Sequence, residues 1–121
     1  MTDARVALGK YGEDLACAEL ARRGYAIVAR RFRCRMGELD IVARDGPTLV
    51  FVEVKARETR EFGGAVHAIT GLKQRRIVRL AQEYMMRHHL HDVPCRFDVV
   101  AIGFEGCDPS IDVYPNAFDA D

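Results

Sequence analysis

Two apolar, strand-like stretches joined by a short turn constrain this chain more than any other feature. The stretches 39–44 and 48–54 are rich in β-branched residues, and Asp45, Gly46 and Pro47 separate them. A hairpin with a buried face must place its apolar residues on that face, so its register can be tested from the sequence alone. Pairing Asp45 with Thr48 aligns apolar partners at three positions, Ala43 with Val50, Ile41 with Val52 and Leu39 with Val54. We therefore expect an antiparallel hairpin in this register.

The same register fixes what lies on the opposite face of the hairpin. It sets Asp40 across from Glu53 and Glu38 across from Lys55, with Cβ atoms of opposed residues roughly 5 Å apart. Two carboxylates in that position repel each other unless a cation sits between them. Hard divalent ions such as Mg²⁺ and Mn²⁺ bind through one or two carboxylates together with water and substrate phosphate. Asp40 and Glu53, with the carbonyl group of Val54, are therefore a candidate divalent-metal site.

Lys55 would add a cation to that site. It lies on the same face of the strand as Glu53, where it could hold or deprotonate an attacking water and stabilise charge that develops on a phosphate. The alternative interpretation is a surface group of Asp, Glu and Lys that exchange salt bridges of little energetic value. The pattern by itself leaves both interpretations open.

Hydrophobic periodicity predicts the remaining elements. Residues 3–23 carry apolar side chains at helical spacing and end at Gly24, a residue favoured just after a helix. In that helix Glu13 is surrounded by the small residues Gly9, Gly12 and Ala16. A second amphipathic helix is predicted over residues 70–88. The expected strands are 25–32, 34–44, 48–56 and 96–104, with a short fifth at 110–114, so the element order is αβββαββ.

Length and composition set the class of protein. The 121 residues, 49% of them hydrophobic, predict one α/β domain spanning 1–121. No apolar stretch approaches the roughly 20 residues of a membrane span, and the first residues lack a secretory signal, so we expect a soluble, cytoplasmic protein with no membrane partner. The four cysteines are far apart and are expected to be reduced thiols.

Charge is unevenly distributed along the chain. Residues 1–91 carry 17 basic and 11 acidic side chains, whereas residues 92–121 carry 1 and 7. A basic body of this kind is compatible with a polyanionic partner, and a solvated charged surface explains it equally well.

Several sequence blocks, which together span nearly the whole chain, resemble the uncharacterised bacterial YraN-type family. They are Gly12-Glu13 in the first helix, GYAI at 24–27, GELDIVA at 37–43, LVFVEVK at 49–55, Phe62-Gly63, and RFDVVA at 96–101. Asp40 followed by Glu53, Val54 and Lys55 also looks like the D…(E/D)xK core of PD-(D/E)xK nucleases. Glu13 resembles a glutamate that archaeal Holliday-junction resolvases contribute from their first helix. The blocks are specific because they occur in order.

The resemblance implies a fold and an activity. The fold is a restriction-endonuclease-like, three-layer α/β/α domain with a central mixed sheet and one helix on each side. The activity is Mg²⁺- or Mn²⁺-dependent hydrolysis of phosphodiester bonds in DNA, including branched or junction DNA. Asp40 and Glu53 would be metal ligands, Glu13 a third carboxylate that reaches the metal directly or through water, and Lys55 the catalytic lysine. A non-catalytic nucleic-acid-binding module and an interaction protein remain as alternatives.

Other residues are candidates for contacts to nucleic acid or for accessory roles. Arg30, Arg31, Arg33 and Arg35 form one basic cluster, and the second helix supplies Lys73, Arg75, Arg76 and Arg79. These side chains suit phosphate contacts, and a merely solvated surface would look the same. Glu38 is either a partner of Lys55 or a residue at the rim of the site, and His67 is an accessory candidate that follows the Gly63-Gly64 loop. Two copies of the chain would be needed to cut two strands symmetrically, so a homodimer is a further expectation.

Overall fold

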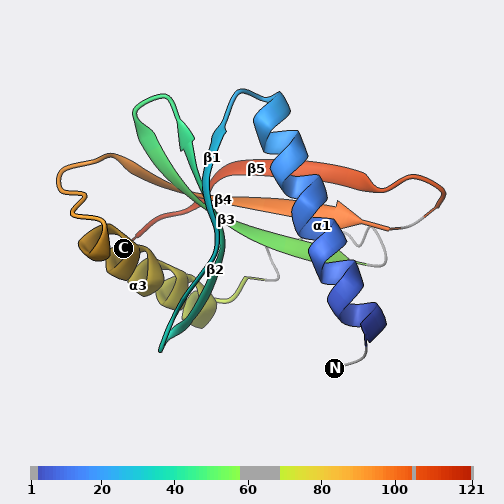
Figure 1. The fold of residues 1–121 in the computed structure, drawn as a ribbon, viewed down its shortest axis with the longest axis horizontal. Helices are drawn as coiled ribbons and strands as arrows, with labels where there is room; N and C mark the ends of the chain where they lie inside the picture. Colours follow the sequence, from blue (N-terminus) through green and yellow to red (C-terminus); the bar gives the residue numbers. More distant parts are fainter. Residues whose placement is uncertain (1–2, 58–68, 105, 121) are drawn as a thin grey trace.

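The computed structural model describes residues 3–57, 69–104 and 106–120. Two helices and five strands make up the described part of the chain, in the predicted order αβββαββ. Their bounds are α1 Asp3–Arg22, β1 Ala26–Cys34, β2 Gly37–Asp45, β3 Thr48–Arg57, α3 Gly71–Arg87, β4 Cys95–Gly103 and β5 Ser110–Phe118. Figure 1 shows the two helices on opposite sides of the strands, with the C-terminal end of the chain beside α3.

The five strands form one mixed sheet with the spatial order β1-β2-β3-β4-β5. The β1–β2, β2–β3 and β4–β5 pairs are antiparallel, and β3 and β4 are parallel. The parallel pair requires a crossover connection, and α3 lies in that connection. The prediction of a three-layer α/β/α domain with a mixed sheet is therefore confirmed.

Each face of the sheet has its own apolar core. On the α1 side, Leu20 packs with Ile41, Val50 and Val100, among other buried residues. On the α3 side, buried residues of that helix, such as Leu80, pack against Val42, Phe51 and Phe97. Because both faces are covered, the central strands alternate between two buried environments rather than between core and solvent.

The predicted element bounds agree with the structure to within a few residues, and β5 is the main difference. This strand continues past the expected end at Tyr114 to Phe118, through Pro115 and through Asn116 at φ 54°. Proline is tolerated there because β5 is an edge strand. Neither described helix contains a stretch long and apolar enough to cross a lipid bilayer.

The hairpin register is confirmed from Asp45–Thr48 to Ile41–Val52. Beyond Ile41 the prediction is wrong, because the registered β2–β3 pairs end there and Leu39 packs on the α3 side instead of facing α1 with Ile41. Thus Asp40 is not paired with Glu53 across the ladder, nor Glu38 with Lys55.

The break in alternation coincides with a backbone irregularity in the neighbouring strand β1. Arg31 has φ 55°, in the left-handed region that L residues rarely adopt. The flanking pairs Arg30–Ile41 and Phe32–Leu39 are registered, whereas Arg31 and Asp40 between them are not. Phe32 and Leu39 both join the α3-side core, so the two strands change faces together at this point.

Candidate functional site

Asp40 lies where strands β2 and β3 part. Strand β3 continues its pairing with β4 as far as Arg57–Gly103, but its registered pairing with β2 ends at Val52. The backbone N–H of Val54 donates a hydrogen bond to Asp40 Oδ2 at 2.8 Å. The aspartate side chain therefore accepts a backbone donor at the point where the ladder between these two strands stops.

The surroundings of Asp40 disfavour its negative charge. Burial is the largest cause, followed by the charge of Glu53; those of Glu13 and Glu38 act in the same direction. Together they raise the pKa of Asp40 to about 7, although the hydrogen bond from Val54 acts in the opposite direction. A carboxylate held in this way next to others is a place where a cation would be favoured.

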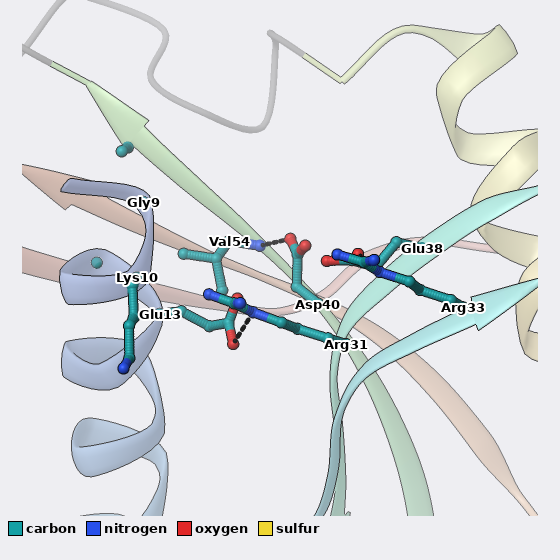
Figure 2. A pocket seen from close by; sticks show the side chains of 10 residues that line it. Gly9, Lys10, Glu13, Arg31, Arg33, Glu38, Asp40 and Val54 are labelled. Carbon is teal, nitrogen blue, oxygen red and sulfur yellow. Dashed lines mark hydrogen bonds and ion pairs between the residues drawn. The ribbon is translucent and has the colours of Figure 1, made fainter. Parts of the chain in front are cut away.

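A pocket of about 330 Å³ opens beside Asp40 on the α1 side of the sheet (Figure 2). The site pocket, as we name it, is bounded by side chains from α1, by charged side chains of β1 and β2, and by the end of β3. Its lining residues are Gly9, Lys10, Gly12, Glu13, Arg31, Arg33, Glu38, Asp40, Val54 and Ala56. Five of the residues singled out in the sequence, Glu13, Arg31, Arg33, Glu38 and Asp40, are thus brought together.

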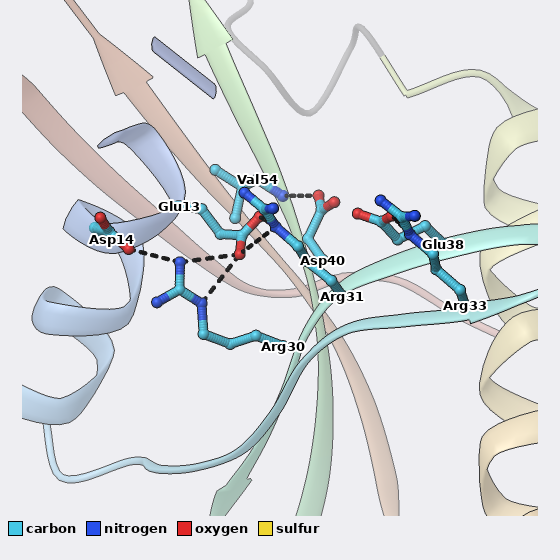
Figure 3. A network of polar contacts seen from close by, with 8 residues as sticks. All are labelled: Glu13, Asp14, Arg30, Arg31, Arg33, Glu38, Asp40 and Val54. Carbon is cyan, nitrogen blue, oxygen red and sulfur yellow. Dashed lines mark hydrogen bonds and ion pairs between the residues drawn. The ribbon is translucent and has the colours of Figure 1, made fainter. Parts of the chain in front are cut away.

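Glu13 is almost fully buried, with 6% of its surface exposed, and it binds two arginines (Figure 3). Arg30 Nε donates to Glu13 Oε1 at 3.0 Å, and Arg31 Nε lies 3.2 Å from both carboxylate oxygens. Arg30 also binds Asp14 at 2.6 Å. Successive residues of a regular strand point to opposite faces, so both arginines reach Glu13 only because Arg31 has a positive φ.

Glu53 lies on the other side of β3 from the site pocket. Its neighbours Val52 and Val54 pack in the α1-side core, whereas Glu53 Oε1 forms an ion pair with Lys73 Nζ of α3 at 3.1 Å. Lys55 follows two residues later on the same strand and is half-buried. Glu53 and Lys55 therefore do not line the site pocket, and Glu53 acts on Asp40 through its charge.

In the described part of the chain, no three side chains of His, Cys, Asp or Glu lie close enough together to hold a metal ion. The predicted ligands Glu13 and Glu53 are each bound to cationic side chains, from β1 and from α3. The cations that pair with these two carboxylates are arginines and a lysine of the chain itself.

The remaining predicted residues fall in three places. Arg33 binds Glu38 at 2.6 Å at the rim of the site pocket, so Glu38 is a rim residue and not a partner of Lys55. Arg35 is exposed in the turn between β1 and β2. Three basic residues of α3 line a second pocket, which is formed by Met36, Leu72, Arg75, Arg76 and Arg79. His67 and the Gly63-Gly64 loop lie outside the described residues.

Sequence reasoning missed Lys10 and did not foresee that Arg30 and Arg31 converge on Glu13. Lys10 had a usable signal, because it precedes Glu13 by three residues and so shares its side of the helix. The convergence of the arginines depends on one backbone angle at Arg31, which no local sequence pattern indicates.

A second polar cluster lies toward the other end of β2 and was also missed. Asp98 is fully buried and accepts hydrogen bonds from Arg96, from the hydroxyl of Tyr25 and from the backbone N–H of Asn116. Arg96 also binds Asp45 at 3.0 Å. This cluster ties the start of β1 and the end of β2 to β4 and β5, and its side chains satisfy one another, which indicates a structural role.

The chain is similar to proteins of one bacterial family. The model of a family described as "Uncharacterised protein family UPF0102" matches residues 12–102. A UPF0102 protein of Geobacter sulfurreducens is 52% identical over 113 residues, covering 93% of this chain and 88% of that protein. One of Geobacter metallireducens is 48% identical over 112 residues (93% and 92%), and one of Syntrophotalea carbinolica is 43% identical over 121 residues (100% and 98%). The chain therefore belongs to the uncharacterised protein family UPF0102.

Proposed function

We propose that this protein is a PD-(D/E)xK-type nuclease that hydrolyses phosphodiester bonds in DNA with Mg²⁺ or Mn²⁺. The observation that carries the proposal is Asp40, a carboxyl group in a gap between two strands whose pKa is raised by burial and by neighbouring carboxylates. Strongly perturbed titratable groups in a pocket are more frequent at functional sites than elsewhere. Basic side chains from α1 and β1 line the same pocket.

Asp40 offers one ligand for a hard divalent ion, and a second carboxylate would have to join it. Asp40 has one oxygen engaged with Val54 N–H and a second that no protein donor holds among the described residues. Glu53, whose charge already acts on Asp40, would be the second ligand; because it faces α3, its ion pair with Lys73 must open and its side chain must turn toward Asp40. Mg²⁺ commonly uses only one or two carboxylates and completes its shell with water and phosphate. When bound, the ion would supply Lewis-acid polarisation of the phosphate and a more acidic water.

The chain's own cations provide the remaining chemistry. Glu13 holds Arg30 and Arg31 in fixed positions, and Arg31 lines the pocket, where its guanidinium can bind a phosphate oxygen. Lys55, two residues beyond Glu53, holds the attacking water and stabilises the developing charge. Lys73, once released from Glu53, becomes available for a second phosphate.

A non-catalytic nucleic-acid-binding module is the second candidate, and a specific observation favours it. In the described residues the carboxylates Glu13 and Glu53 are neutralised by arginines and a lysine, and no three-ligand group is preformed. A protein that only binds phosphates would keep its basic residues in this arrangement without ever exchanging them for a metal.

Cleavage assays separate the two candidates. Labelled single-stranded, duplex, flapped and four-way-junction DNA are incubated with Mg²⁺ or Mn²⁺ and with wild-type protein, Asp40→Asn or Asp14→Asn. Asp14 is a matched control because it lies one residue from Glu13 and binds Arg30 without lining the site pocket. Metal-dependent cutting that is lost only in Asp40→Asn supports the nuclease. Binding without cutting on every substrate supports the module, and equal cutting by all three proteins indicates a contaminant.

A further inference from the structure

The second pocket combines three arginines with two exposed apolar side chains. Its volume is about 280 Å³, and it is formed by α3 together with the turn between β1 and β2. We name it the arginine pocket. Leu72, at the start of α3, is 64% exposed, and Met36, in the turn, is 40% exposed. Exposed side chains of this size at one place, framed by charge, are typical of a binding surface more than of a solvated helix face.

The cations of the arginine pocket form no ion pair within the described part of the chain, and the carboxylate that lines a neighbouring pocket with Arg75 is Asp119. Arg75, Arg76 and Arg79 occupy the first turns of α3, which carry no acidic residue, and none of the three forms an ion pair with a described residue. The other basic residues of this helix differ, because Lys73 binds Glu53 and Arg87 binds Glu83. Like charges at neighbouring positions of a helix destabilise it by a few tenths of a kcal/mol. An anionic partner would remove that cost.

A groove at the start of β2 extends from the site pocket toward the arginine pocket. This shallow groove, lined by Arg33, Cys34, Gly37 and Glu38, shares Arg33 and Glu38 with the site pocket. Gly37, at φ 138°, brings this backbone close to α3, where an added Cβ atom would lie 3.9 Å from the side chain of Arg76. Figure 3 shows Glu38 and Arg33 between Asp40 and α3. One extended ligand could therefore contact both pockets.

We propose that the arginine pocket binds an unpaired nucleotide of the nucleic acid whose phosphodiester lies at Asp40; this inference rests on the proposed function. The guanidinium groups bind its phosphates, and Leu72 and Met36 contact the face of its base. A fully paired duplex presents phosphates but keeps its base faces stacked, so it would leave both apolar side chains unused. The volume lies at the lower limit of small-molecule pockets, about 300 Å³, which suits one base. The substrate class is thus DNA with a single-stranded region beside the cleaved bond.

Binding measured in EDTA tests this proposal independently of catalysis. Fluorescence anisotropy compares a blunt duplex with the same duplex carrying a single-stranded flap, for wild-type protein, Leu72→Ser and Met86→Ser. Met86 is the matched control, since it is 62% exposed in the last turns of the same helix and lies outside the arginine pocket. We expect wild type to bind the flapped DNA more tightly. Leu72→Ser should reduce that preference roughly five-fold, the lower end of base-contact energies, and Met86→Ser should leave it unchanged.

The arginines are tested by the salt dependence of the same binding. Replacing Arg76 by Gln should flatten the slope of log affinity against log salt by about one phosphate contact on the flapped DNA, whereas Arg87→Gln should not. Equal affinity of wild type for both DNAs, or a preference that survives Leu72→Ser, overturns the proposal. Cleavage with Mg²⁺, measured in parallel, distinguishes failure of the arginine-pocket proposal from failure of the proposed nuclease activity. Cutting without the Leu72-dependent preference refutes only the arginine pocket, and the preference without cutting refutes only the nuclease.

Discussion

Replacing Asp40 by Asn should stabilise the protein at alkaline pH and leave its stability almost unchanged at pH 4. The pKa of this carboxyl group is raised from 3.8 to about 7 in the folded state. Below pH 3.8 the group is neutral in both the folded and unfolded states, so it makes no difference to folding. Between pH 3.8 and 7 the unfolded chain loses the proton that the folded chain keeps. Stability is therefore lost as the pH rises through this range.

The size of the effect follows from the two pKa values. A difference of roughly three pH units, at about 1.4 kcal/mol each, gives an upper limit of about 4 kcal/mol at pH 8. We expect Asp40→Asn to raise the free energy of unfolding at pH 8 by about 2–4 kcal/mol. The gain falls below the limit because the side chains of Glu53 and Glu13, which repel Asp40, can move when it is neutralised. Asparagine keeps the shape and the acceptor for the Val54 N–H, so the substitution removes charge and little else.

Urea unfolding in EDTA at pH 4 and pH 8 measures this difference, with Asp14→Asn as the control for removal of an exposed carboxylate nearby. Adding Mg²⁺ at pH 8 should then stabilise the wild type and not Asp40→Asn, since an ion that binds only the folded state adds to its stability. If Asp40→Asn destabilises the protein equally at both pH values, burial and the neighbouring carboxylates do not raise the pKa of Asp40. The argument for a cation at this position would then fail.

Three further substitutions test other parts of the structure. Glu13→Gln should cost about 1–3 kcal/mol in urea unfolding at pH 7, since it removes the buried negative charge that pairs with two arginines and replaces one acceptor oxygen by an NH₂ donor; a change below about 0.5 kcal/mol would contradict the geometry. Asp98→Asn should cost about 1–3 kcal/mol in the same assay, because the fully buried Asp98 carboxylate accepts charge-assisted hydrogen bonds from the half-buried Arg96, which keeps Asp45 as its remaining charged partner, and DNA binding should persist in the folded fraction. Lys73→Gln should tighten Mn²⁺ binding several-fold in calorimetric titration, because it removes the cation that occupies Glu53; weaker binding would show that this lysine does not compete with the ion.

The sequence by itself determined the elements and most of the hairpin. The helix at residues 70–88 was predictable because its buried residues Ile77, Leu80, Ala81 and Tyr84 recur at helical spacing. The register from Asp45–Thr48 to Ile41–Val52 followed from matching apolar residues, because a shift by one residue would have turned every side chain to the wrong face. Both patterns are local and periodic, so the sequence carries them directly.

Only the tertiary structure decided how the carboxylates are arranged. Alternation fails at Arg31 and Asp40, where a positive φ in β1 and the packing of Leu39 on the α3 side turn both strands. Lys73 is 20 residues from Glu53 in the sequence, and their ion pair exists because α3 returns across the sheet. Alternation of apolar and polar residues predicts side-chain positions only in a regular ladder. It carries no information about a helix that packs against one end of the sheet. The residue types at the site were therefore readable from the sequence, and their partners were not.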